Sequence, residues 1–141
     1  MNYDMVGPVL ALGISAIGSC VGCYIAGSAS HAALGKSEEG HAKFIAMASA
    51  PSSQMLYGFI LMLFMRNAIH AGTLDPFAAL FIGGVIGLAL AVSAIYQGMV
   101  CATGIQTILK QPDLFAKCFI AIGVIESFAL FALAFSLMLL Q

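Results

Sequence analysis

The amino-acid sequence predicts an all-α integral membrane protein with four transmembrane helices arranged as two hairpins. Of its 141 residues, 62% are hydrophobic and only 8% are charged, against about 25% charged residues in a typical soluble domain. The mean hydropathy is +1.05, and the hydrophobic residues gather in four long stretches. The formal net charge of −1 leaves no basic excess to neutralise phosphates. A free soluble domain is therefore excluded, and the charge balance argues against a nucleic-acid-binding protein.

Four stretches are long enough to cross a bilayer, which takes about 20 apolar residues per helix. They are residues 5–33, 44–65, 77–108 and 114–140. Residues 1–4 hold neither Lys nor Arg, and the first stretch is too long for a signal-peptide core, so we expect it to remain as a mature helix. The links, residues 34–43, 66–76 and 109–113, hold Gly, Pro and charges, as turns do. Because these links are short, the long helices are expected to form antiparallel hairpins.

Positive charges are unevenly divided between the links. Lys36 and Lys43 flank the first link and Lys110 and Lys117 flank the third, whereas the second holds only Arg66. Cytoplasmic loops carry the excess of Lys and Arg in membrane proteins. Links 34–43 and 109–113 are therefore predicted to be cytoplasmic, with both termini on the other side of the membrane.

The two halves of the chain are related by an internal repeat. A shift of 74 residues places Lys36 on Lys110 and brings both charged links and all four stretches into register. We therefore expect two copies of one hairpin, at about 5–67 and about 76–141, within a single membrane domain of residues 1–141. The shift also sets Glu126 opposite Ser52, so only the second copy holds this acid.

The predicted helices are of two kinds. Helices 5–33 and 77–108 are rich in small residues at four-residue spacing, such as Gly18 and Gly22, and this spacing lets helix backbones approach closely in lipid. Helices 44–65 and 114–140 hold bulkier side chains such as Phe59 and Phe128. A closed ring of many copies, with the thin helices in an inner layer, would use this difference. Ordinary packing within a four-helix monomer would also use it.

Glu126 lies near the middle of a predicted span, whereas the other five acids lie in links or near helix ends. An ionised carboxylate at that depth costs at least a few kcal/mol. Two interpretations follow. Glu126 is either a protonated, hydrogen-bonded structural residue or a carrier of an ion or a proton.

Polar side chains from two other helices lie at the same depth as Glu126. Glu126 is 13 residues past Asp113 and Gln97 is 13 before Lys110. Ser53 and Gln54 are 14 and 15 residues past Glu39, so all four lie about 20 Å along their helices from the same side. Carboxylate, amide and hydroxyl oxygens suit a hard cation such as Na⁺, and one negative charge matches one monovalent ion. For either glutamine alone, the other interpretation is a hydrogen bond between helices.

The helix at 44–65 is expected to be irregular beside this level. Four of its residues are spaced i, i+3, i+4, i+7 and so share one face: Ala50, Ser53, Gln54 and Tyr57. Pro51 has no N–H and frees the carbonyl of Met47. That carbonyl is either left free beside the site or satisfied by another donor in a tolerated kink.

The cysteines and histidines are expected to have structural or solvated roles. Cys20 and Cys23 form a CxxC pair, but inside an apolar helix, without the strand or polar loop of a redox motif. All four cysteines are expected to pack as small residues. His31, His41 and His70 lie near helix ends or in links and are expected to be solvated.

Three segments together resemble a known family: PSSQMLYG (residues 51–58), SAIYQG (93–98) and GVIESFAL (123–130). They resemble the rotor proteolipid, known as c or K, of V-type and V/A-type rotary ATPases, and the resemblance covers nearly the whole chain. It implies a rotor ring of identical subunits in the lipid bilayer, turned by ATP hydrolysis in a peripheral headpiece or driving ATP synthesis in reverse. It also implies a membrane stator subunit and central-stalk subunits as partners.

The resemblance implies a role for each residue of the site. In sodium-transporting members the pattern makes Glu126 the carboxylate that carries Na⁺. The other implied members are the amide oxygens of Gln97 and Gln54, the hydroxyl of Ser53, the backbone carbonyl of Ala50, and Tyr57 as a hydrogen-bond donor to Glu126. The hydroxyl position is often Thr in the family, and Ser53 keeps the oxygen without the methyl group. Proton-transporting relatives tend to lack the full polar set, so the resemblance favours Na⁺, with H⁺ as the alternative.

Two other function classes are weighed against the rotor. A small four-helix secondary transporter with an intramembrane Glu would need a substrate cavity, often lined by aromatics, whereas this chain has no Trp. A purely structural scaffold would leave Glu126 without a role. The sequence contains no phosphate-binding loop, so we expect that the chain does not hydrolyse ATP itself. Its compact sequence and sodium-type residues suggest a bacterial plasma membrane, with a vacuolar membrane as the alternative.

Overall fold

The computed structural model describes residues 3–140, and all its regular elements are helical. Helix α1 covers Val6–Leu34. A broken helix follows, made of α2 (His41–Ser49), the 3₁₀ turn η1 (Ala50–Ser52) and α3 (Ser53–His70). Helix α4 covers Pro76–Lys110, and the 3₁₀ turn η2 (Pro112–Leu114) leads into α5 (Phe115–Met138). Residues 1, 2 and 141 of the predicted domain lie outside the described range.

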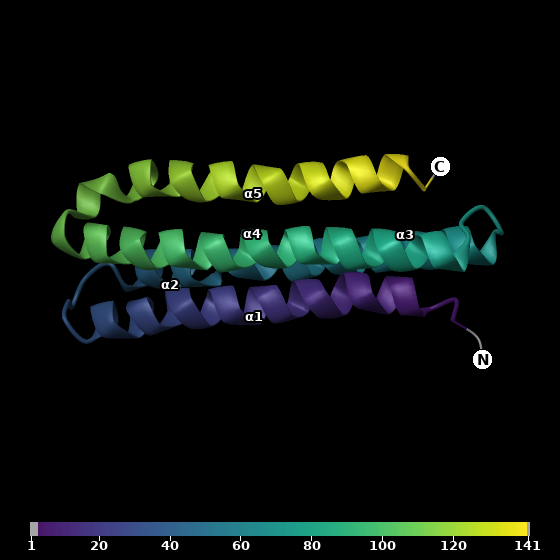
Figure 1. Cartoon of the computed structure of the whole chain (residues 1–141). Helices are drawn as coiled ribbons and strands as arrows, with labels where there is room; N and C mark the ends of the chain where they lie inside the picture. Colours follow the sequence, from purple (N-terminus) through teal and green to yellow (C-terminus); the bar gives the residue numbers. More distant parts are fainter. Residues whose placement is uncertain (1–2, 141) are drawn as a thin grey trace.

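These elements form four long rods, which lie side by side (Figure 1). The connection after α1 and the connection between α4 and α5 lie at one end, which we call the link end; the connection after α3 and the first and last described residues lie at the other (Figure 1). Each rod is long and apolar enough to cross a membrane: Val6–Leu34, His41–His70, Pro76–Lys110 and Pro112–Met138. The predicted fold of four spans in two hairpins is confirmed.

The second rod reaches further into its two links than the hydropathy predicts. The second rod begins at His41 and ends at His70, so the first two links shrink to residues 35–40 and 71–75. Lys43 and Arg66 end the apolar stretch, but long charged side chains do not disfavour a helix. Hydropathy therefore marked where the apolar character stops, whereas the backbone continues as a helix beyond it.

Glycine, aspartate and proline residues mark where the helices begin and end. Gly40 and Gly72 have positive φ angles of 81° and 75°. This backbone conformation is unfavourable for residues that have a Cβ atom, and glycine has none. Asp75 caps α4, because its carboxylate accepts hydrogen bonds from the backbone N–H groups of Phe77 (2.9 Å) and Ala78 (3.1 Å). Pro76 occupies the first turn of α4, where its missing N–H costs nothing.

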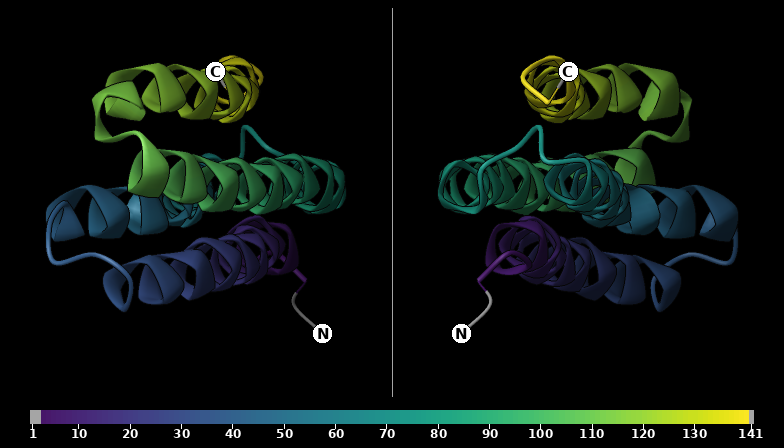
Figure 2. Two further views of the ribbon diagram at one scale, coloured as in Figure 1. Left: turned by 90° about the vertical axis from the view of Figure 1, so that its left-hand side faces the viewer. Right: turned by 90° about the vertical axis from the view of Figure 1, so that its right-hand side faces the viewer.

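The helices pack in three layers with a polar level across the middle. Helix α4 and the α2–α3 rod lie side by side, with α1 on one side of this pair and α5 on the other (Figure 2). Two apolar clusters flank the middle, one around Met47 and Ile105 and the other around Leu61 and Leu133. Between them lie the fully buried side chains of Gln54 and Gln97.

Small residues bring α1 and α4 into close contact, as their spacing predicts. A Cβ atom added at Gly18 would overlap Ala91, and one added at Gly98 would overlap the backbone of Gly22. The same holds nearer the chain termini, where a Cβ atom on Gly83 would overlap the carbonyl of Gly7. We call this contact the glycine seam: Gly7, Gly18 and Gly22 of α1 with Gly83, Ala91 and Gly98 of α4.

The glycine seam should tolerate no added methyl group. Gly22→Ala is expected to destabilise the fold by about 1–3 kcal/mol, because the new Cβ atom meets the Ala94 carbonyl and must push α1 and α4 apart. Gly27→Ala on the same helix is the control, since a Cβ atom there has no neighbour within 4 Å. Thermal unfolding in mild detergent measures both, and equal midpoints for the two variants would contradict the seam.

Candidate ion-binding site

The site begins at the turn η1, where Pro51 interrupts the second rod. The Met47 carbonyl, which loses its ordinary partner at Pro51, accepts a hydrogen bond from the Ala50 N–H. The structure therefore shows the kink with a satisfied carbonyl. The next carbonyl in this turn, that of Ala50, accepts from the backbone N–H of Ser53 and from the Ser53 hydroxyl at 3.1 Å. The irregular turn thus places the Ser53 hydroxyl and the Ala50 carbonyl next to each other.

The Glu126 carboxylate on α5 meets three donors from two other rods. The Tyr57 hydroxyl donates to Oε1 at 2.5 Å. The Gln54 side-chain amide donates to Oε2 at 3.4 Å, and the Gln97 side-chain amide donates to the same oxygen. The Glu126 side chain is half-buried. An acid near the middle of a span is therefore held by hydrogen bonds from its own chain.

The two glutamines join the helices behind the carboxylate. Both are fully buried. Gln54 Nε2 donates to Gln97 Oε1 at 2.9 Å, and Gln97 Nε2 also donates to the Ile122 carbonyl at 3.4 Å. The Ser53 hydroxyl approaches Gln54 Oε1 at 3.2 Å. Each helix pair around the site is thus linked by at least one side-chain hydrogen bond.

Two serines that the site prediction left out support this arrangement. Ser19 Oγ on α1 accepts the backbone N–H of Met55 at 3.0 Å, which holds the start of α3 in place. Ser93 Oγ on α4 donates to the Ile125 carbonyl at 3.2 Å, beside Glu126. Ser19 and Ser93 coincide under the 74-residue shift, so the repeat was the signal that could have found them.

The predicted set therefore comes together in space. Glu126, Gln97, Gln54 and Tyr57 are joined directly by hydrogen bonds. Ser53 bonds to Gln54, and Ala50 is reached through Ser53.

The remaining reactive residues lie apart from the site's hydrogen bonds. All four cysteines are free, with Cys20 exposed and Cys101 buried, and His31, His41 and His70 are exposed. Within residues 3–140, no group of three or more His, Cys, Asp and Glu could hold a metal ion. Cation chemistry at this level would therefore rest on one carboxylate together with amide, hydroxyl and carbonyl oxygens.

Such a set of side chains can contact either the carboxylate alone or a bound cation. A side-chain amide carries two N–H donors on one side and an acceptor oxygen on the other. With its nitrogen towards Glu126 a glutamine satisfies the carboxylate, and after a half-turn of the amide its oxygen would face a bound cation. In the part of the chain described, every buried side-chain polar atom has a hydrogen-bond partner.

Comparison with known proteins adds a family and two relatives. The model of the family of ATP synthase C subunits matches the chain twice, at residues 6–65 and at residues 80–139. The second match begins 74 residues after the first, which confirms the internal repeat. The K subunit of the A-type ATP synthase of Methanocaldococcus jannaschii is 30% identical over 135 residues, which cover 96% of this chain and 60% of that relative. The chain thus spans three fifths of that relative's length.

A second relative matches over nearly its whole length. The K subunit of the V-type sodium ATPase of Enterococcus hirae is 28% identical over 144 residues, covering 98% of this chain and 92% of the relative. The family model thus matches each of the two hairpins, and both relatives align with nearly the whole chain.

The Ser19 hydroxyl should contribute to stability through the Met55 N–H. Ser19→Ala removes the acceptor and leaves that N–H unpaired, at an expected cost of about 1–3 kcal/mol. Ser28→Ala is the matched control on the same helix, because the Ser28 hydroxyl is exposed and bonds only to the Tyr24 carbonyl of its own helix. Thermal unfolding in detergent compares the two, and a loss for Ser28→Ala as large as that for Ser19→Ala would contradict the prediction.

Proposed function

The chain belongs to the family of ATP synthase C subunits, as a proteolipid of the c/K type, and from this membership we propose that it is the rotor-ring subunit of a V-type or V/A-type ATPase that carries Na⁺ on Glu126. Identical copies form the ring, and its rotation is driven by ATP hydrolysis or drives ATP synthesis. One observation carries the proposal: a single carboxylate at mid-span depth meets Gln54, Gln97 and Tyr57 from two other rods.

The oxygen donors support Na⁺ as the ion. A proton needs only the carboxylate, whereas Gln54 and Gln97 place two more potential oxygen ligands at the same point. The Ser53 hydroxyl and the Ala50 carbonyl lie next to Gln54 and complete a shell of the hard donors that Na⁺ prefers. The similarity to a K subunit whose name is that of a sodium ATPase points the same way. Transport of H⁺ on the same carboxylate is the alternative.

The cycle follows from the cost of a charge in lipid. An ionised Glu126 facing hydrocarbon would cost a few kcal/mol or more, so the carboxylate faces lipid only when Na⁺ neutralises it. The Tyr57 hydroxyl closes the site from the side of α3. Where a stator subunit replaces lipid, a stator arginine competes for the carboxylate and the ion leaves. Two offset half-channels in the stator then admit and release the ion on opposite sides.

The energy for this cycle comes from outside the chain. Moving one charge against 100 mV costs about 2.3 kcal/mol. The chain has no phosphate-binding loop, so hydrolysis takes place in other subunits and this subunit is not itself a hydrolase. The links at 34–43 and 109–113 face the cytoplasm and contact the central-stalk subunits. Residues 1–141 act as one membrane domain in a bacterial plasma membrane.

Removal of the negative charge should stop transport. Glu126→Gln keeps the size and hydrogen-bonding capacity of the side chain but cannot neutralise Na⁺, so ATP-driven Na⁺ uptake into vesicles holding the whole ATPase should fall to background. Ring assembly, followed by native gel electrophoresis, should be unchanged. Glu38→Gln in the exposed first link is the control and should pump normally. Wild-type uptake by Glu126→Gln would refute the assignment.

Na⁺ should protect Glu126 from a hydrophobic carbodiimide. The reagent modifies protonated carboxyls in apolar surroundings, and bound Na⁺ would hold Glu126 in its ionised form. Labelling should therefore concentrate on Glu126, and added NaCl should slow it where the same concentration of choline chloride does not. Tyr57→Phe should need more Na⁺ for equal protection, because one donor to the carboxylate is lost. Equal labelling with and without Na⁺ would favour H⁺ as the carried ion.

A further inference from the structure

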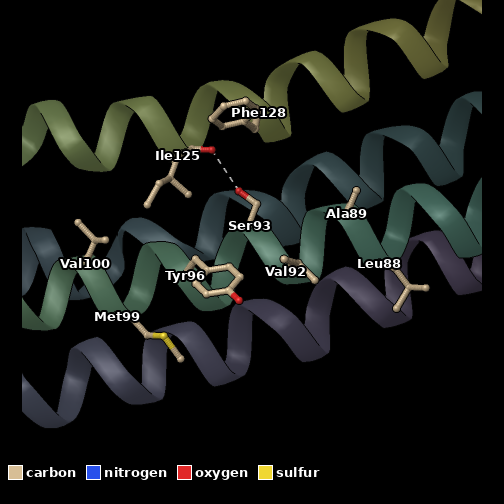
Figure 3. Close-up of a pocket in the computed structure, with 9 residues that line it drawn as sticks. All are labelled: Leu88, Ala89, Val92, Ser93, Tyr96, Met99, Val100, Ile125 and Phe128. Carbon is tan, nitrogen blue, oxygen red and sulfur yellow. Dashed lines mark hydrogen bonds between the residues drawn. The ribbon is translucent and has the colours of Figure 1, made fainter.

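The hollows along α4 change in character towards the link end. Near mid-span, the groove between α4 and α5 has a volume of about 670 Å³ and is lined mainly by apolar side chains, such as Val92 and Phe128 (Figure 3). Its serine, Ser93, already donates its hydroxyl to the Ile125 carbonyl (Figure 3). At the link end, by contrast, two neighbouring hollows on α4 are lined by a lysine. Both lie where the spans Val6–Leu34 and Pro76–Lys110 end, which is the level of lipid headgroups.

The larger of these two hollows, which we call the basic hollow, takes its lining from both thin helices. It has a volume of about 340 Å³, and its lining is Ala29, Ala32, Ala33 and Lys36 of α1 with Gln106, Leu109 and Lys110 of α4. The neighbouring hollow, of about 310 Å³, shares Gln106 and Lys110 and adds Gln111 and two threonines. Among the residues that the structure describes, no Asp or Glu lines either hollow.

The internal repeat explains why two lysines share one hollow. Lys36 and Lys110 coincide under the 74-residue shift. Residues of α1 and α4 that meet along the glycine seam are separated by nearly the same number of positions, as in Gly22 and Gly98. Repeat counterparts therefore lie at the same level on neighbouring helices. A lysine that occurs once in each hairpin thus becomes a pair.

The helix ends account for part of this positive charge, but not for all of it. Lys110 is the last residue of α4, and Lys36 follows the end of α1 at Leu34. A cation at a helix C-terminus offsets the negative end of the helix dipole, which amounts to about half a charge per helix. Two lysines therefore leave the basic hollow with an excess of positive charge, and its lining holds no carboxylate to balance it.

The basic hollow is charged at the helix ends and apolar further into the span. Ala29 lies seven residues before Lys36, or about 10 Å deeper. Ala32, one turn before Lys36, is exposed, and its small side chain leaves room beside α1. This arrangement fits an amphiphile whose anionic group is followed by an acyl chain. A free phosphate ion or an acidic protein segment would match the lysines but has no acyl chain for the alanines.

We propose that the basic hollow binds the headgroup of an anionic phospholipid, with the phosphate between Lys36 and Lys110 and an acyl chain along Ala29 and Ala32. A lysine ammonium group has three donors for phosphate oxygens, and the Gln106 amide can donate as well. Basic pockets between transmembrane helices bind such headgroups in other membrane proteins. The site requires only that the link end lies at a membrane surface, and it is independent of the ion that the chain carries.

Photo-crosslinking from lipid tests the site in the full chain. The chain is reconstituted into phosphatidylcholine vesicles that contain a small fraction of phosphatidylglycerol with a diazirine beside its headgroup. After irradiation, mass spectrometry of the digested chain should place the adducts on the lining of the basic hollow. Phosphatidylcholine with the same diazirine should give at least tenfold fewer adducts there, because its choline cancels the phosphate charge. Equal labelling by the two lipids, or adducts centred elsewhere on the link end, would overturn the site.

Single substitutions test the lysine pair. Lys36→Gln and Lys110→Gln should each reduce labelling by the phosphatidylglycerol probe about fivefold, which is the contribution of one lysine near anionic lipid. Lys117→Gln is the matched control, because Lys117 is an exposed lysine of the same end that lines neither hollow. Thermal unfolding in mild detergent checks that all three variants fold. An equal loss of labelling in Lys117→Gln would reduce the effect to general surface charge and contradict a site at the lysine pair.

Competition separates a phospholipid from other anions. Soluble glycerol phosphate carries the headgroup phosphate without acyl chains, so a large excess of it should leave the labelling unchanged. Complete displacement by glycerol phosphate would assign the hollow to a soluble phosphate ester instead. The labelling should also persist in vesicles that hold the whole ATPase. Its loss when the central-stalk subunits are bound would assign the hollow to an acidic surface of the stalk, which overturns the lipid site and leaves the rotor standing.

Discussion

The structure depends on one constraint: an acidic side chain in the middle of an apolar span has to be satisfied by hydrogen bonds from its own protein. Tyr57, Gln54 and Gln97 meet that demand at Glu126. Both glutamines are fully buried, and they are hydrogen-bonded to each other. Apolar clusters on either side of this level keep the polar groups together, because unpaired polar groups have no other partner in hydrocarbon.

The close approach of α1 and α4 provides the frame for this polar level. Neither thin helix contributes the carboxylate, yet each holds a bulky helix in place through one serine, Ser19 at the Met55 N–H and Ser93 at the Ile125 carbonyl. These serines are repeat counterparts, but Ser19 accepts a backbone N–H whereas Ser93 donates to a backbone carbonyl. The hairpins differ at the position that is Ser52 in one and Glu126 in the other. The second hairpin therefore holds the acid together with one donor, Gln97, and the first hairpin adds the donors Gln54 and Tyr57.

The repeat also relates the inside of the chain to its outside. Small residues at the glycine seam join the two hairpins, whereas their counterparts on the outer faces are Ile17, Tyr24, Val92 and Tyr96. Small residues thus join the two hairpins, whereas bulkier side chains occupy the equivalent outer faces.

The sequence by itself determined the four spans, the 74-residue repeat and the common depth of Glu126, Gln97, Ser53 and Gln54, because hydropathy and helical rise are properties of each segment alone. Only the tertiary structure decided that the Met47 carbonyl bonds to the Ala50 N–H, that Ser19 reaches the Met55 N–H, and that both amides donate to the carboxylate. Those contacts depend on how far each helix is rotated about its axis and how closely it approaches its neighbours. That rotation and spacing follow from the packing of glycines between helices far apart in the chain, which no single segment specifies.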